Sequence, residues 1–174
     1  LSQRWSAYLR EREMLPKEYF TDADTQKLSR LRQEFVELLK AVGYNSALSF
    51  DEISISNSTF LPEVKGFDMR FDSSASDNIR AIWAFILSLL KVSIQYNGNH
   101  QMLLICDEPK QQNIVDSDFK VLFEKVIELG KGTQTIIGIT AKDEGIINIV
   151  NLLPKGTYNY IDIGDKGFTK TEQA

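Results

Sequence analysis

Two adjacent carboxylates, Asp107 and Glu108, are the residues of this sequence with the clearest capacity for chemistry. They follow the short apolar run 103–106 and precede Pro109. An apolar run of this length, bounded by turn residues, is typical of a strand covered on both faces. Ligands of open α/β sheets bind just beyond the carboxyl ends of such strands. At that position a first carboxylate can orient Mg²⁺, and a second can activate a water molecule, as in nucleotide hydrolysis. The alternative is an ordinary acidic turn.

A second candidate site is the small-residue segment 73–78, which lies directly before the apolar stretch 79–90. Small side chains let backbone N–H groups approach an anion closely, and the start of a helix carries a partial positive charge. The segment therefore indicates a phosphate-binding helix start. The alternative is a plain helix N-cap provided by Ser76.

The first 45 residues are expected to be helical and to form a segment separate from the rest. Pro16 separates a helix over 2–14 from a second helix, for which Asp22 and Asp24 offer N-caps and Gly43 marks the C-terminal end. Apolar residues recur in the second helix at alternating spacings of three and four: Leu28, Leu31, Phe35, Leu38 and Val42. This seam fits either a coiled coil or an amphipathic helix packed on a domain.

The remaining sequence alternates between strand and helix patterns. The expected strands are 52–56, 67–71, 101–106 and 135–140; the expected helices are 79–90, 116–130 and 144–153; and 158–163 with 167–170 form a hairpin. From residue 79 onward this order predicts parallel strands with right-handed crossovers. The fold class is therefore α/β.

Composition excludes several classes of protein. The 174 residues carry a net charge of −4, which argues against a dedicated polyanion binder. The single cysteine, Cys106, cannot form an internal disulfide, so we expect a cytoplasmic location and a buried, inert thiol. The longest apolar run, 81–87, is too short for a bilayer that needs about 20 residues, so no membrane partner is expected. The single histidine, His100, is expected in a surface loop.

The two candidate sites together resemble the C-terminal lobe of an ABC-type ATPase head of the kind in SMC proteins, RecN and related coiled-coil ATPases. Segment 73–77 (SSASD) is similar to the LSGGQ/E signature, and 103–109 (LLICDEP) is similar to Walker B with its catalytic glutamate. The resemblance implies a three-layer, P-loop NTPase-like lobe with a mainly parallel sheet over 46–174. It also implies that 1–45 is the helical segment returning from a coiled coil.

The same resemblance implies ATP and Mg²⁺ as cofactors and assigns a role to each site residue. Glu108 would be the catalytic base and Asp107 the Mg²⁺ ligand. The remaining nucleotide-binding residues implied are Ser74, Ala75, Ser76 and Asp77 at the signature, Asp116 in the D-loop and Thr140. The signature would contact the γ-phosphate held by a second head, so a homodimer is implied, with DNA as a further partner in maintenance, repair or defence.

The sequence departs from the family pattern at four places. Ala75 and Ser76 replace the signature glycines. The switch histidine is missing, so either Thr140 or Lys142 senses the γ-phosphate in its place or that function is lost. The loop before Asp116 is two residues longer than the usual pattern, so Asp116 is either the D-loop aspartate or a helix cap. No G-x-x-x-x-G-K-[ST] phosphate loop occurs in the sequence, which begins at Leu1 rather than Met. We therefore expect a fragment that needs its own N-terminal Walker A lobe and is inactive alone.

Two other functions are compatible with the sequence. One is a non-enzymatic α/β interaction domain that binds a partner through the seam at residues 28–42. The other is a metal-dependent nuclease that uses Asp107, Glu108 and Lys110, although Pro109 breaks the strand alternation that would aim these side chains at one metal.

Overall fold

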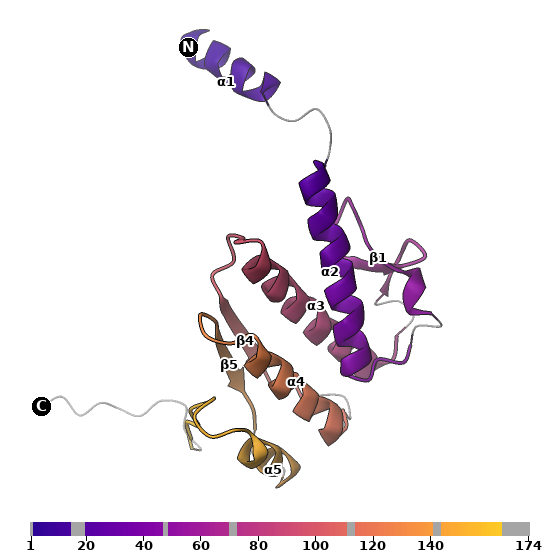
Figure 1. Cartoon of the computed structure of the whole chain (residues 1–174), viewed down its shortest axis with the longest axis vertical. Helices are drawn as coiled ribbons and strands as arrows, with labels where there is room; N and C mark the ends of the chain where they lie inside the picture. The colour runs from indigo at the N-terminus through magenta and orange to yellow at the C-terminus, as the bar shows by residue number, and fades with distance from the viewer. Residues whose placement is uncertain are drawn as a thin grey trace, which may run out of the picture. The chain divides into compact units, whose positions relative to one another are not determined.

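A computed structural model describes residues 2–14, 20–46, 49–69, 73–110, 114–140 and 144–164 of the chain (Figure 1). It divides into two units, Leu1–Thr140 and Ala141–Ala174, and each is described by itself. The elements are α1 (Ser2–Glu13), α2 (Asp22–Ala41), η1 (Phe50–Glu52), β1 (Ile53–Ile55), β2 (Pro62–Val64), β3 (Phe67–Asp68), α3 (Ala75–Gln95), β4 (Leu103–Asp107), α4 (Asp116–Glu128), β5 (Gln134–Gly138) and α5 (Glu144–Leu152). The fold is mixed α/β.

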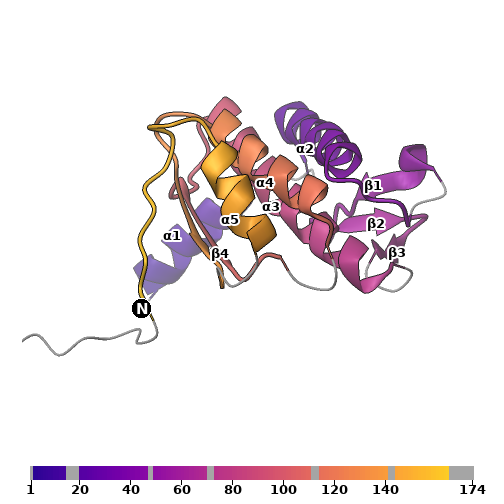
Figure 2. The same cartoon turned by 90° about the horizontal axis from the view of Figure 1, so that it is seen from below.

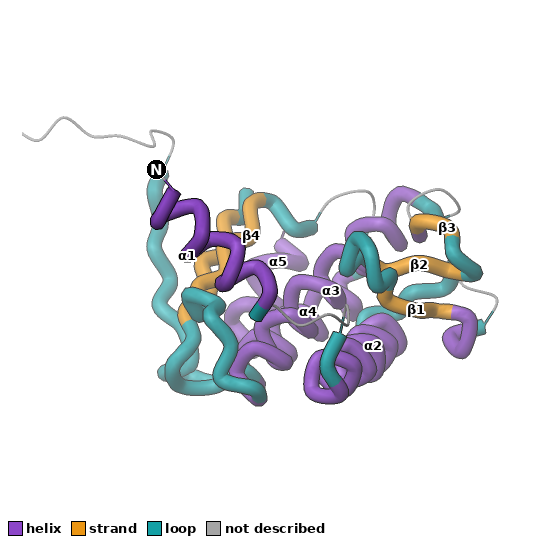
Figure 3. The backbone as a smooth tube through the Cα atoms, turned by 90° about the horizontal axis from the view of Figure 1, so that it is seen from above, coloured by secondary structure: helices purple, strands orange, loops and turns teal. Residues whose placement is uncertain are grey.

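The strands of the first unit form two separate sheets (Figure 3). Strands β1, β2 and β3 make a small antiparallel sheet, whereas β4 and β5 pair in parallel, in register from Leu103 opposite Gln134 to Asp107 opposite Gly138. Helix α4 connects the two parallel strands. The prediction of parallel strands joined by a helix is therefore confirmed for β4 and β5. Strand β3 is shorter than the expected 67–71, of which residues 70 and 71 lie outside the described residues.

Helix α2 begins and ends with local hydrogen bonds that the sequence specifies in part. Thr21, not Asp22 or Asp24, is the N-cap: its hydroxyl accepts the N–H of Asp24 at 3.2 Å, while the Asp24 carboxylate bonds back to Thr21. This bonding lowers the pKa of Asp24. At the other end Gly43 has a φ of +74°, and Tyr44 N–H donates to the Leu39 carbonyl at 3.0 Å. The expected glycine stop is confirmed.

The apolar seam of α2 faces the interior of the first unit. Its members Leu31, Phe35, Leu38 and Val42 are all buried. Helix α2 lies along α3 and also contacts β1 (Figures 1 and 2), and Phe35 meets Phe85 of α3 edge to face with ring centres 5.8 Å apart. Of the two alternatives for this seam, the structure has the amphipathic helix packed on a domain.

A carboxylate is buried in the same α2–α3 interface. Glu34 is fully buried and pairs with Arg30 on its own helix and with Lys91 of α3, whose Nζ lies 2.5 Å from Oε2. Burying a charge is costly unless it is paired. The pair therefore favours the observed alignment of α2 along α3, because a shift of one turn would leave Glu34 buried and without Lys91.

Strand β4 is covered on one face only, which corrects the expectation of a doubly covered strand. Leu104 and Cys106 are buried, but Ile105 is 64% exposed and Leu103 is 37% exposed. On the neighbouring β5, Ile136 is 48% exposed. Within the first unit these three apolar side chains form a partly open face. Helix α3 also exposes Ile82, at 57%, despite its nearly continuous apolar sequence.

The second unit contains helix α5 followed by an extended segment. The helix matches the expected range 144–153 and buries Ile146, Ile149 and Val150. No strand forms over 158–163, so the first half of the expected hairpin is wrong, and 167–170 lies outside the described residues. Throughout the described ranges, no helix combines the length and apolarity that crossing a membrane requires.

Candidate functional site

The two adjacent acids lie at the carboxyl end of the parallel pair. Asp107 is the last residue of β4, is exposed, and pairs with Gly138 of β5. The chain then turns sharply: Glu108 has a φ of +45°, and its N–H donates to the Gly138 carbonyl at 2.8 Å. Residues other than glycine and asparagine are uncommon in this left-handed region. Where they do occur, they are often found at functional sites. The geometry thus presents both carboxylates at the sheet edge where ligands bind.

Thr140 contacts Glu108 directly. Its hydroxyl donates to Oε1 of the Glu108 carboxylate in a short hydrogen bond, although 32 residues separate the two in sequence. Thr140 is two residues beyond the end of β5 and is exposed, while Glu108 is half-buried. Among the site residues predicted from sequence, the structure therefore brings Glu108 and Thr140 together, beside Asp107.

The Asp107 carboxylate lies beside Gly138 of the neighbouring strand. A Cβ added to Gly138 would lie 3.4 Å from Asp107 Oδ1, which is an ordinary van der Waals contact. Magnesium is usually held by one or two carboxylates, with substrate phosphates and water completing its shell. Among the described residues, no group of three or more acidic, histidine or cysteine side chains could enclose a metal. Two carboxylates outside any larger ligand cluster are compatible with Mg²⁺ only if other groups supply the rest of its shell.

The start of α3 is capped by Ser74 rather than Ser76. The Ser74 hydroxyl accepts the N–H of Asp77 at 3.1 Å, and Ser76 Oγ lies 3.2 Å from Ser74 Oγ. The helix begins at Ala75, four residues earlier than the apolar stretch alone predicts. Ser74 and Ala75 are exposed, so the first N–H groups of α3 lie at the surface of the unit.

Replacing Ser74 with alanine tests this cap. We expect Ser74→Ala to lower the free energy of unfolding by about 1 kcal/mol, because the Asp77 N–H loses its acceptor. Ser76→Ala is the matched control and is expected to change it by less than about 0.5 kcal/mol. Urea unfolding followed by circular dichroism measures both. A larger loss for Ser76→Ala would contradict the assignment of the cap.

Asp77 points into the protein rather than toward a ligand. It is 5% exposed, and its Oδ2 accepts from the Ser46 hydroxyl at 2.5 Å and from the Asn45 N–H at 3.3 Å. Its Oδ1 accepts from Arg80 Nη1 at 2.9 Å. Both oxygens are therefore used within the chain, which corrects the expectation of a nucleotide contact by this carboxylate and leaves Ser74, Ala75 and Ser76 at the helix start.

Arg80 joins the starts of α3 and α4, and sequence reasoning did not find it. Besides Asp77, it bonds Asp118 near the start of α4, with Nη2–Oδ2 and Nε–Oδ2 distances of 2.6 and 3.0 Å. Gly43 at the end of α2 is also adjacent, since a Cβ there would lie 3.0 Å from Asp118 Oδ2. The signal in the sequence that could have identified this residue is its place as a single arginine within an otherwise apolar helix. Both helices start at the end of the unit where β4 and β5 end (Figure 1).

Asp116 is the first residue of α4 and does not cap it. Val115 occupies the N-cap position without a side-chain hydrogen bond, and Asp116 pairs instead with Lys110, at an Nζ–Oδ1 distance of 2.5 Å. Of the two expectations for Asp116, the helix cap is wrong. The pair also engages the lysine on which the nuclease alternative depends.

The single cysteine and the single histidine have the environments expected of them. Cys106 is buried, and desolvation raises the pKa of its thiol, which makes it a poor nucleophile at neutral pH. His100 is exposed and accepts the Met102 N–H at 3.0 Å. Neither takes part in the site.

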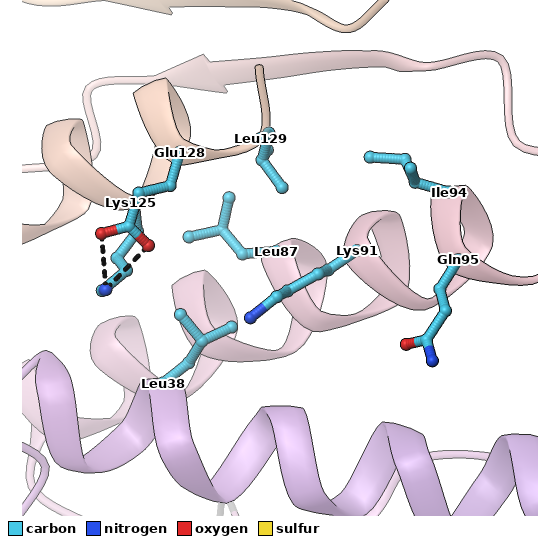
Figure 4. A pocket seen from close by; sticks show the side chains of 8 residues that line it. All are labelled: Leu38, Leu87, Lys91, Ile94, Gln95, Lys125, Glu128 and Leu129. Atoms are coloured by element: carbon cyan, nitrogen blue, oxygen red, sulfur yellow. Dashed lines mark hydrogen bonds and ion pairs between the residues drawn. The ribbon is translucent and has the colours of Figure 1, made fainter.

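Two cavities of the first unit lie away from the two acids. One of about 270 Å³ lies between α2, α3 and α4. It is lined by Leu38, Leu87, Leu129 and Lys91, and by Lys125, which pairs with Glu128 (Figure 4).

Comparison of the chain with protein-family models, with curated proteins and with solved structures finds no match. The functional argument therefore rests on the residues and their geometry.

Proposed function

We propose that this chain is the C-terminal lobe of an ABC-type ATPase head, of the kind found in SMC-like coiled-coil proteins, and that it hydrolyses ATP together with a phosphate-loop lobe. One observation carries the proposal. Glu108 stands at the carboxyl end of a parallel strand pair, next to Asp107 and fastened to the end of β5 by the Gly138 carbonyl and the Thr140 hydroxyl. This is where an open α/β sheet binds and transforms a phosphate ligand.

In the proposed reaction Glu108 is the general base. It takes a proton from a water molecule as the water oxygen forms a bond to the γ-phosphorus. The bond from that phosphorus to the β–γ bridging oxygen breaks, and ADP leaves with the electron pair. Asp107 would hold Mg²⁺, which when bound neutralises charge on the phosphate oxygens. The exposed helix start at Ser74 and Ala75 would contact the γ-phosphate of ATP held by a second head.

The open face of β4 and β5 supports the proposal that a further lobe packs on this sheet. Leu103, Ile105 and Ile136 remain 37%, 64% and 48% exposed on one side of the pair. A parallel sheet is normally covered on both faces. An N-terminal lobe that covers this face would complete the three-layer, P-loop-like fold and would supply the Walker A loop. The second head would make the assembly a homodimer, with DNA as its substrate in maintenance, repair or defence.

The interaction-domain alternative has less support, because the seam at residues 28–42 that would bind a partner lies mostly in the core. Leu31, Leu38 and Val42 are each at most 5% exposed. A helix bound there would have to displace α3 or β1.

Hydrolysis by two forms of the protein tests the proposal. We expect the protein that unites this chain with a phosphate-loop lobe to bind ATP and to release phosphate in the presence of Mg²⁺. The 174-residue chain alone is expected to release none, because the loop that cradles the phosphates is lacking. Steady-state phosphate release measures both. Mg²⁺-dependent turnover by the pure chain, or no ATP binding by the united protein, would contradict the proposal.

A further inference from the structure

The end of β5 holds Glu108 at two points. The Gly138 carbonyl accepts the backbone N–H of Glu108 at 2.8 Å, and the Thr140 hydroxyl donates to its side-chain Oε1. The first contact holds the backbone at its φ of +45°, and the second holds the end of the side chain. Because β4 and β5 are in register, the residues that follow each strand lie beside each other. A half-buried glutamate with several rotatable bonds is thereby kept in one orientation.

We propose that Thr140 is the positioning residue of Glu108 and that Glu108 takes the proton through Oε2. The inference rests on the proposed function, since it specifies how the base of that reaction is oriented. Oε1 is occupied by the hydroxyl of Thr140, whereas Oε2 receives no hydrogen bond from the described residues. The hydrogen bond from Thr140 occupies Oε1, so Oε2 is the oxygen left to accept from a water molecule.

A threonine at this position makes the orientation of Glu108 independent of pH in the neutral range. A threonine hydroxyl does not gain or lose a proton at physiological pH, whereas a histidine does. Thr140 therefore positions Glu108 equally well across the neutral range. Holding a reacting group in its productive orientation has a large kinetic value, and a misplacement of about 1 Å can cost a hundredfold in rate. Thr140 acts on turnover through Glu108 and not through affinity for ATP.

Two substitutions at Thr140 in the united protein test the proposal by kinetics. Thr140→Val keeps the shape and removes the hydroxyl, and we expect kcat to fall about ten- to a hundredfold while the KM for ATP stays within about twofold. Thr140→Ser keeps the hydroxyl and is expected to recover most of that loss. Thr133→Val is the matched control, because it also removes a hydroxyl–carbonyl hydrogen bond, to Gly130, but at the other end of β5. Its kcat is expected to stay that of the parent.

The split between kcat and KM decides whether the assignment of Thr140 holds. A raised KM with unchanged kcat in Thr140→Val would show that Thr140 contacts the nucleotide instead, and would overturn the proposal. Equal kcat in Thr140→Val and the parent would also overturn it. So would equal losses in Thr140→Val and Thr140→Ser.

A measurement without turnover separates this inference from the proposed function. The methyl group of Thr140, labelled with ¹³C in the united protein without ATP, is expected to change its chemical shift in Glu108→Ala. It is not expected to change in Glu128→Ala, which removes an exposed carboxylate on α4. If the shift changes but the parent hydrolyses no ATP, the contact stands and the proposed function fails. If the parent hydrolyses ATP and the shift does not change, the positioning role fails.

Discussion

Glu108→Gln is expected to lower ATP turnover of the united protein by at least about a hundredfold while leaving ATP affinity within about twofold. Glutamine has the shape of glutamate and keeps an Oε1 that can accept from Thr140, so the side chain stays in place. It has no basic carboxylate, so the attacking water keeps its proton. Steady-state phosphate release measures the turnover, and equilibrium binding measures the affinity.

Glu124→Gln is the matched control for this substitution. Glu124 is an exposed carboxylate on α4 whose pair with Lys120 spans 3.5 Å, so its removal is expected to leave turnover unchanged. In Glu108→Gln the ATP-bound dimer of heads is also expected to last longer, because hydrolysis no longer separates it; light scattering after ATP addition measures its lifetime. Equal hydrolysis by Glu108→Gln and the parent would remove Glu108 from the mechanism.

Arg80→Met is expected to lower the free energy of unfolding by about 3–5 kcal/mol, the usual cost of removing one partner from a buried charge network. The side chains of Arg80, Asp77 and Asp118 are 10%, 6% and 19% exposed. Methionine fills a similar volume but leaves Asp77 in the interior without its cation. The starts of α3 and α4 then lose their charged contact and keep the ring contact between Trp83 and Phe119.

Lys120→Met on α4 is the comparison for Arg80→Met. It removes one positive charge from an exposed pair whose side chains are 47% and 49% exposed, so we expect a loss of less than about 1 kcal/mol. Urea unfolding of both variants, followed by circular dichroism, gives the difference. Equal losses would show that the network around Arg80 contributes no more than a surface ion pair.

The features that the sequence predicted correctly depend on local patterns. The apolar run at 103–106 and its counterpart in 134–138 pair in parallel because a helix-length segment separates them. Gly43 ends α2 because only a residue without a side chain adopts a φ of +74° at little cost. These signals lie within a few residues of the structure that they specify, so the sequence alone is sufficient to find them.

The features that the sequence could not predict depend on residues far apart in the chain. Asp77 has the spacing of a signature residue, but Arg80 and the loop at residue 46 turn it inward. Glu108 and Thr140 were each proposed for the site, yet their contact follows only from the register of β4 and β5. The sequence also predicted that both faces of β4 are covered. An apolar run does not specify how many faces of a strand other elements cover, because those elements lie elsewhere in the chain.

The buried carboxylate between α2 and α3 has a mechanical consequence. Glu34 is fully buried and its Oε2 lies 2.5 Å from Nζ of the half-exposed Lys91, so sliding one helix along the other separates a buried carboxylate from its cation. An unpaired buried charge is costly, so the pair opposes such sliding.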